Sequence, residues 1–346
     1  MKVIVTLLLL LSLSCVSSAC SGTSAAPAPT PVADRSEPSP VPPTPVPPTP
    51  VPPTPVPALG PQLPATVSDY EGNPVTITAV DRIVALNGDI TEIVVALGLG
   101  PNLVGVDLSA TYPPELVATL PRIGYQYNLN AEGILGLNPS LVIGKEGAGP
   151  PEVISQLRAA GIPVMLVSDP QDIGAPATKI RAVAAALGVR EAGEQLVATL
   201  EADLAAAQAR LAETTAPAPK VLFLYLRGTT TQAVAGRDTA ADTMITAAGG
   251  INIAAEQGLE GFEMLSPELV ALAQPDVILL MESGLQSMGG AAGLLAIPGL
   301  ADTPAGQAGR VVAMDGLYLV GLGPRTGQAI LDLLPQLHPE LMEPRS

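Results

Sequence analysis

The stretch AEGILGLNPSLVIG, residues 131–144, is repeated in pattern by PELVALAQPDVILL, residues 267–280, and this repeat decides the fold. The two segments align without a gap, so that Glu132 matches Glu268, and each glutamate is followed seven residues later by a proline. Each segment has the pattern of a short helix, a turn marked by proline and a buried strand. The same supersecondary unit therefore occurs twice, which predicts two similar α/β lobes.

A long helical section at 171–214 lies between the two copies, with a break expected near Gly188. Its second half, REAGEQLVATLEADLAAAQARLAE, is about 24 residues long, or ~36 Å at ~1.5 Å per residue. On either side, at 65–170 and 215–346, short apolar runs suited to buried parallel strands alternate with helical patterns. We therefore predict two Rossmann-like α/β lobes bridged by a single long helix, with the ligand cleft between the lobes.

The N-terminal region predicts export. It begins MKVIVTLLLLLSLSCVSSACSG, with one lysine, an apolar run too short to span a membrane, and small residues before a cysteine. This layout resembles a bacterial lipoprotein signal, with a signal peptide at 1–19 and a lipidated Cys20 that anchors the protein to the outer side of the cell membrane. Cys15 is the rival lipidation site, and a plain secretory peptide is the alternative. Residues 20–64 contain three VPPTP units and predict a disordered, extended tether of ~3.1 Å per residue.

The composition argues against several classes of function. A net charge of −16 argues against nucleic acid as a partner, because nucleic acid requires a basic surface. The single histidine, His338, leaves no metal site built on several imidazoles and no Ser-His-Asp or Cys-His catalytic system. No glycine-rich phosphate-binding pattern opens a helix after a strand. We therefore expect a binding protein without a catalytic cofactor; an α/β hydrolytic enzyme is the remote alternative.

The strand VLFLYLRGT at 221–229 ends in Tyr225 and Arg227, which share one side of a pleated strand. Tyrosine positions are informative here, since the chain has six Tyr, two Phe and no Trp. Five of the six follow predicted strands or lie in the loops after them, and three of the few cations lie at equivalent loop positions. Together they indicate a flat or aromatic, anionic ligand. These residues are Tyr112, Tyr125, Tyr127, Tyr225 and Tyr318, and Lys145, Arg227 and Arg237.

Several motifs, spread over residues 80–337, carry a family resemblance that extends over most of the folded chain. They are ATYPPE (110–115), GAGPPEVISQLRAAGIPV (147–164), LYLRGT (224–229), AGRDTAADTMITAAGG (235–250), GLQSMGGAAGLLAIPGLADTPAG (284–306) and VVAMDGLYLVGLGPRT (311–326). The region resembles the substrate-binding proteins of ABC transporters that have two α/β lobes joined by one long helix. These proteins serve haem, ferric siderophores and cobalamin, and within them the chain is most similar to the haem-binding branch.

The resemblance implies a role for specific tyrosines. In one haem-binding subgroup, a Tyr two residues before an Arg is an axial iron ligand, a spacing matched by Tyr225 and Arg227. Its opposite ligand is a histidine of the first lobe, and here Tyr127 stands at that position. Another subgroup uses the tyrosine of the TYP motif, which is Tyr112. Ferric iron is a hard cation suited to a phenolate, and a neighbouring guanidinium favours the anionic phenol.

The remaining candidates complete the predicted site. Arg227, Lys145 and Arg237 are candidates for supporting the iron ligand or for pairing with a haem propionate. The resemblance also implies that Glu132 and Glu268 dock the protein onto its membrane permease. Ferric haem is the predicted ligand, and a ferric siderophore or cobalamin carried by the same architecture is the alternative. Residues expected to line the cleft are Tyr125, Phe262, Met281 and Tyr318.

Overall fold

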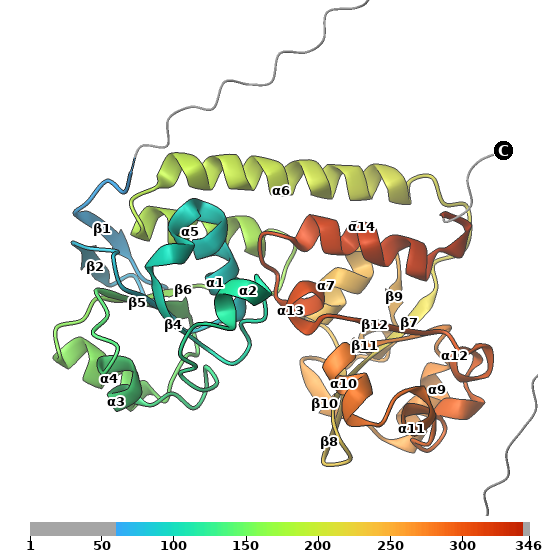
Figure 1. The fold of residues 1–346 in the computed structure, drawn as a ribbon. Coiled ribbons are helices and arrows are strands. Elements are labelled where there is room, and N and C mark those ends of the chain that lie inside the picture. The colour runs from blue at the N-terminus through green and yellow to red at the C-terminus, as the bar shows by residue number, and fades with distance from the viewer. Residues whose placement is uncertain (1–59, 342–346) are drawn as a thin grey trace, which may run out of the picture. The chain divides into compact units, whose positions relative to one another are not determined.

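The computed structural model describes residues 60–341 (Figure 1). The predicted signal peptide, Cys15, Cys20 and all but the last few residues of the predicted tether lie outside these residues. The chain is already packed at the end of the predicted tether, where Gln62 N donates to Gly188 O (2.8 Å) and Leu63 contacts the first core. None of the helices described is long and apolar enough to cross a membrane.

The N-terminal lobe is built on a parallel sheet of four strands in the order β4-β3-β5-β6, preceded by an antiparallel β1–β2 pair. Successive residues of β3 point into two different cores, Ile83 and Ala85 into one and Val84 into the other. The central strands therefore carry apolar residues on both faces, as buried parallel strands require. The strands are β1 (Ala65–Ser68), β2 (Pro74–Ile77), β3 (Ile83–Ala85), β4 (Leu103–Val106), β5 (Leu141–Lys145) and β6 (Val164–Val167).

The C-terminal lobe has a mixed sheet in the order β10-β8-β7-β11-β12, with β9 also paired to β7. Strands β7, β11 and β12 are parallel, whereas β8 is antiparallel to both β7 and β10. The antiparallel edge was absent from the sequence prediction, because its short strands carry no continuous apolar run. The strands are β7 (Lys220–Arg227), β8 (Thr231–Ala235), β9 (Ile251–Asn252), β10 (Phe262–Met264), β11 (Val277–Met281) and β12 (Val311–Met314).

Helices cover both sheets, and most are short. In the first lobe they are α1 (Gly88–Val94), α2 (Pro114–Val117), α3 (Ala131–Leu135) and α4 (Pro151–Ala159). In the second lobe they are α7 (Ala240–Ala247), α8 (Ile253–Glu256), α9 (Pro267–Ala273), α10 (Glu282–Ser287), α11 (Ala291–Leu295), α12 (Pro304–Ala308), α13 (Gly316–Val320) and α14 (Thr326–Leu337).

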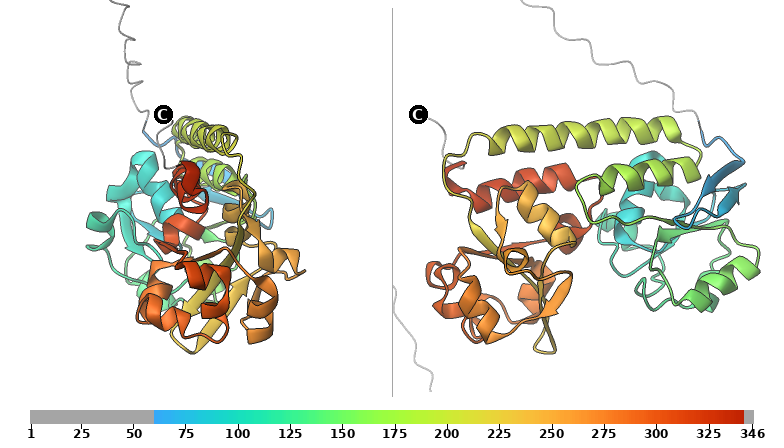
Figure 2. Two further views of the ribbon diagram at one scale, coloured as in Figure 1. Left: turned by 90° about the vertical axis from the view of Figure 1, so that its right-hand side faces the viewer. Right: turned by 180° about the vertical axis from the view of Figure 1, so that it is seen from behind.

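A long helix connects the lobes, as predicted. After α5 (Ala175–Ala186) the chain turns at Gly188, whose φ of +71° favours glycine, and enters the 22-residue α6 (Arg190–Leu211). Val197 and Leu200 of α6 pack into the core of the first lobe, whereas Ala207 packs into that of the second. Figures 1 and 2 show α6 running along both lobes, with α5 and α14 beneath it. One rigid element therefore belongs to both cores.

The two copies of the internal repeat form the same helix–strand unit in the structure. These copies are α3 followed by β5 and α9 followed by β11, and each strand lies parallel to a central neighbour in its own sheet. Glu132 and Glu268 are exposed residues in the first turns of α3 and α9. Both helices lie on the side of their lobe away from α6 (Figure 1). The sequence repeat thus corresponds to two equivalent units with one exposed glutamate each.

Candidate ligand-binding site

Tyr225 and Arg227 lie at the carboxyl end of β7 and share one face of the sheet. Val221 and Phe223, which precede them on that face, are buried in the core beneath α7 and α14, and half-buried Tyr225 packs at its edge. Arg227 Nε donates to the Tyr225 hydroxyl oxygen at 2.5 Å. The pattern of one strand therefore places a phenol and a guanidinium side by side where the core ends.

The first lobe contributes Tyr125 to the same group. The Arg227 guanidinium carbon lies 5.3 Å from the centre of the Tyr125 ring and 5.4 Å from that of Tyr225. Arg227 Nη1 lies 3.5 Å from the Tyr125 hydroxyl oxygen, at the outer limit of a hydrogen bond. Its contacts with Tyr125 and Tyr225 raise the pKa of Arg227 above its usual value. One cation of the second lobe thus contacts a phenol from each lobe.

Apolar side chains of β10, at the antiparallel edge of the sheet, lie next to this group of phenols. The Phe262 ring meets that of Tyr225 edge to face, with centroids 5.7 Å apart and an interplanar angle of 67°. Met264, two residues later on β10, lies on the same face and is paired in register with Ala233, which is itself paired with Tyr225. Met264 is 66% exposed. Sequence reasoning missed it because the edge strand itself was not recognised.

Tyr112 and Tyr318 form a second aromatic group around Arg325. The Arg325 guanidinium carbon lies 3.8 Å from the centre of the Tyr112 ring and 4.7 Å from that of Tyr318. Arg325 also forms an ion pair with the buried Glu92 of α1. The Tyr318 hydroxyl donates to Asp332 Oδ2 at 2.8 Å, and burial together with Asp332 raises the Tyr318 pKa, so this phenol stays neutral. Sequence reasoning assigned Arg325 no role.

Tyr127 and Met281 differ in their surroundings. Tyr127 lies two residues after Tyr125 and is 71% exposed, and none of the hydrogen bonds or ring contacts among residues 60–341 involves its side chain. Met281 is half-buried at the end of β11 and packs against the core of the second lobe beside Tyr225 and Tyr318. Tyr127 is therefore free to meet a ligand, whereas Met281 packs against the same core as Tyr225 and Tyr318.

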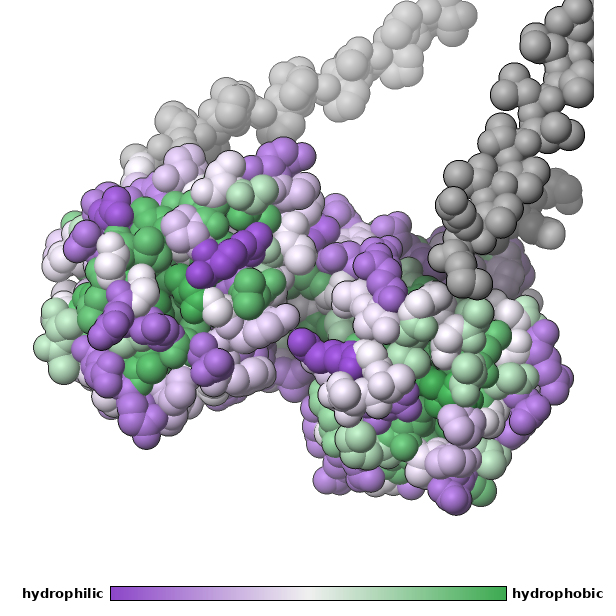
Figure 3. All heavy atoms as spheres, turned by 60° about the horizontal axis from the view of Figure 1, so that its bottom comes forward, coloured by the Kyte–Doolittle hydropathy of each residue, from purple (hydrophilic) through white to green (hydrophobic). Residues whose placement is uncertain are grey.

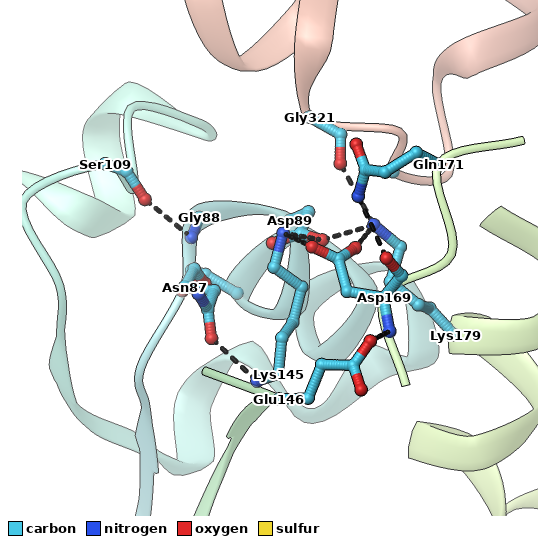
Figure 4. A network of polar contacts seen from close by, with 12 residues as sticks. Asn87, Gly88, Asp89, Ser109, Lys145, Glu146, Asp169, Gln171, Lys179 and Gly321 are labelled. Atoms are coloured by element: carbon cyan, nitrogen blue, oxygen red, sulfur yellow. Dashed lines mark hydrogen bonds and ion pairs between the residues drawn. The ribbon is translucent and has the colours of Figure 1, made fainter. Parts of the chain in front are cut away.

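Lys145 and Arg237, predicted to face the ligand, have other partners. Lys145 pairs with Asp169 at 2.9 Å and with Asp89 at 3.4 Å, inside a polar network shown in Figure 4. Burial lowers the Lys145 pKa, but the two carboxylates outweigh this effect and raise it above its usual value. Arg237 is exposed and donates to Ala255 O at 2.9 Å. Of the three predicted cations, only Arg227 contacts the tyrosines.

The contact between Tyr125 and Arg227 lies where the two lobes meet. Figure 3 shows the surface hollowed between the two lobes. Among the described residues, cavities of about 730 and 710 Å³ lie elsewhere, one beside β1 and the start of α6, the other between α6 and α7. No group of three or more His, Cys, Asp and Glu among residues 60–341 could hold a metal ion. The residues that meet between the lobes therefore offer phenols, one phenyl ring and two cations, Arg227 and Arg325.

Comparison with known proteins identifies the family. The family model described as "Periplasmic binding protein" matches residues 83–317, which include both sheets and α6. The chain belongs to this family. It is therefore an exported substrate-binding protein and not an enzyme, as the sequence predicted. The match also covers the tyrosines at the hollow, except Tyr318, which lies one residue beyond it.

Solved structures and curated proteins give more detailed similarities. The periplasmic heme-binding protein RhuT from Roseiflexus sp. RS-1, in apo form, is 59% identical, with a TM-score of 0.74 over 76% of this chain and 100% of its own. Other heme-binding proteins, BhuT, HmuT and HutB among them, are 34–40% identical, with TM-scores of 0.68–0.76.

Two curated relatives are named for a lipoprotein and for vitamin B12. The uncharacterized ABC transporter substrate-binding lipoprotein YvrC of Bacillus subtilis (strain 168) is 29% identical over 80% of this chain and 86% of its own length. A vitamin B12-binding protein of Yersinia pestis (strain Pestoides F) is 30% identical over 60% of this chain and 71% of its own length. The curated relatives therefore include a protein named for vitamin B12, whereas the solved structures above are named for heme.

Proposed function

We propose that this chain captures ferric haem in the hollow between its lobes and delivers it to the permease of an ABC importer. The observation that carries the proposal is the group formed by Tyr225, Arg227 and Tyr125, which places an arginine between phenols of both lobes. The heme-binding proteins of known structure, up to 59% identical, support the choice of ligand.

Tyr225 is the proposed iron ligand. A phenol has a pKa near 10 and must lose its proton to bind ferric iron well, which an adjacent guanidinium favours by donating to the anionic oxygen. Arg227 Nε already donates to this oxygen at 2.5 Å. Variants of the heme-binding protein HmuT with alanine in place of a tyrosine, or of an arginine two positions later, have been crystallised, and Tyr225 and Arg227 have that spacing.

Three tyrosines of the first lobe, Tyr112, Tyr125 and Tyr127, are candidates for contacting the ligand. Tyr125 shares Arg227 with Tyr225 and would face the same side of a bound macrocycle. Tyr127 is the most exposed of the three and is the proposed second iron ligand. Tyr112 has its ring covered by Arg325. Phe262 and Met264 provide an apolar surface on which the macrocycle would lie, since exposed apolar side chains gathered at one place often mark binding sites.

A corrinoid or a ferric siderophore is the second candidate ligand. The relative named for vitamin B12 is the observation in its favour. A corrinoid would use the same apolar surface but has no need of a phenolate next to a guanidinium. The Tyr225–Arg227 pair suits the axial position of a ferric haem iron and therefore favours haem over a corrinoid.

The proposal extends to anchoring and docking. Cys20, with Cys15 as the alternative, would carry the lipid that holds the protein at the membrane, as the name of the Bacillus subtilis relative suggests. Glu132 and Glu268 would contact the permease, one from each lobe. They support this role by being exposed on equivalent helices, α3 and α9.

Hemin titration of residues 56–346 tests the ligand. This fragment is one compact unit, and a solved relative aligned over its whole length with 76% of this chain folds by itself. We expect saturable binding with a ferric tyrosinate spectrum, and loss of that spectrum in Tyr225→Phe. Tyr70→Phe, a tyrosine outside the hollow, is the matched control. Absence of saturable hemin binding, or binding of cobalamin in its place, would contradict the proposal.

A further inference from the structure

The lobes meet directly at a second place, apart from the Tyr125–Arg227 contact. The loop between α13 and α14 of the second lobe packs on α1 of the first. At Gly323 in this loop, a β-carbon would lie only 3.1 Å from Glu92 Oε2. Lys179 Nζ of α5 donates to Gly321 O at 3.1 Å. The loop therefore lies tightly against the first lobe, independently of the connection through α6.

Arg325, which follows this loop, is held mainly by the opposite lobe. Its guanidinium pairs with Glu92 of α1 and stacks on Tyr112, while Tyr318 of its own lobe lies on it at 4.7 Å. Both aromatic contacts fall within the ~6 Å range of cation–π attraction. Arg325 Nε is buried, and no hydrogen-bond partner for it occurs among the described residues. Glu92 and the two rings therefore determine where this guanidinium lies.

Glu92 depends on Arg325 in return. Its side chain is 4% exposed, and Arg325 is its only ion-pair partner in the described part of the chain. Burial raises the pKa of Glu92, and Arg325 counteracts this by favouring the charged form. Removing the arginine alone would leave a buried carboxylate without its counter-ion, which is strongly unfavourable. The two residues thus act as a unit that joins the lobes.

Tyr112 completes this unit from the first lobe. It lies in the loop after β4, which is tied to the start of α1 because Ser109 Oγ accepts from Gly88 N at 2.9 Å. With Arg325 at 3.8 Å over its face, the Tyr112 ring takes its orientation from the second lobe. We propose that Glu92, Arg325 and Tyr112 form an inter-lobe clamp that sets the width of the hollow, with Arg325 as its positioning residue and Tyr112 as a clamp residue rather than an iron ligand.

The distance between the lobes tests the clamp without any ligand. Spin labels at Gln156→Cys on α4 and Ala271→Cys on α9, both exposed, report this distance in residues 56–346, which contain no other cysteine. We expect a broadened or shifted distance distribution in Arg325→Met. The double variant Glu92→Gln/Arg325→Met should show the same change in the distance distribution. It also removes the charge of Glu92, which would otherwise be buried without a counter-ion and could prevent folding.

Arg181→Met is the matched control, because it removes a surface arginine paired with Glu194 rather than an inter-lobe one. Its distance distribution should equal that of the parent protein. An unchanged distribution in the folded Glu92→Gln/Arg325→Met variant would overturn the clamp.

Hemin spectra test the role of Tyr112, and this part rests on the proposed function. Tyr112→Phe keeps the ring for Arg325, so the tyrosinate spectrum should remain and affinity should change by less than about twofold. Tyr112→Leu removes the ring and should weaken binding by about tenfold. Loss of the tyrosinate spectrum in Tyr112→Phe would make Tyr112 the ligand and overturn the assignment. If the parent protein binds no hemin, the proposed function fails, while the distance measurement still decides the clamp.

Discussion

Arg227 Nη1 of the second lobe lies 3.5 Å from the hydroxyl oxygen of Tyr125 of the first, 102 positions earlier in the chain. Arg227 Nε, in contrast, lies 2.5 Å from the hydroxyl oxygen of its strand neighbour Tyr225. The shorter contact is a property of one strand and survives any lobe motion. The longer contact depends on how the lobes are held, so a small separation would break it.

Loss of the Arg227 guanidinium should weaken hemin binding. A hydrogen bond to a charged partner contributes about 1.5–3 kcal/mol, so Arg227→Met should lower affinity by roughly ten- to a hundredfold. Hemin titration of both proteins, followed by visible spectroscopy, measures these affinities. Arg227→Lys, which keeps the charge, should bind with an affinity between those of the parent and Arg227→Met. Equal affinity of the parent and Arg227→Met would count against the role.

Asp107 should make the fold less stable as pH rises. Burial raises its pKa to about 6, although hydrogen bonds from Ser109 oppose the shift. The folded state therefore holds this proton more tightly than the unfolded chain, and the stabilisation is complete below pH ~4 and lost as pH rises through ~6. The loss amounts to roughly 3 kcal/mol at ~1.4 kcal/mol per pKa unit.

Urea unfolding of Asp107→Asn between pH 4 and 7 checks this. The difference in free energy of unfolding between parent and variant should shift in the variant's favour as pH increases. Glu152→Gln, which alters an exposed acid, is the control and should show no such trend. A difference that stays constant across the range would refute the prediction.

Lys179 should be essential for stability. Its side chain is fully buried and contacts Asp89 at 2.6 Å and Asp169 at 3.2 Å (Figure 4). Lys179→Met leaves the buried Asp89 with Lys145 alone at 3.4 Å, and such a loss typically costs about 3–5 kcal/mol. Arg181→Met, which breaks an exposed ion pair on the same helix, should cost about 1 kcal/mol or less. Denaturant unfolding measures both, and equal costs would mean that the network adds nothing to stability.

Glu132 and Glu268 should matter for delivery but not for capture. Glu132→Ala/Glu268→Ala should leave the hemin titration unchanged, because both residues lie outside the aromatic group. Hemin uptake by cells that depend on this importer should fall, and more for the double variant than for either single one. Glu152→Ala, also an exposed glutamate in the first turn of a helix, controls for the loss of helix-dipole stabilisation of ~0.3–1 kcal/mol. Normal uptake by the double variant would exclude docking through these residues.

Local patterns predicted the architecture well. The repeat at 131–144 and 267–280, the apolar runs of the parallel strands and the break at Gly188 all depend on neighbours close in sequence. The short antiparallel strands β8 and β10 were missed, since five and three residues are too few to show a periodic apolar signal. Met264 was missed with them.

The partners of charged side chains were predicted less well. Lys145 was expected to face the ligand, yet Asp89 and Asp169, 56 positions earlier and 24 positions later, engage it. Arg325 was given no role, although Glu92 and Tyr112 from the other lobe surround it. Nothing near these residues in the sequence indicates such partners.

Strand and helix periodicity are local, and they were enough to predict two α/β lobes that share a long helix and to put Tyr225 beside Arg227. The contacts of Tyr125 with Arg227 and of Tyr112 with Arg325 became visible only in three dimensions. Those contacts depend on how the two lobes meet, and the side chains that meet there come from distant parts of the chain.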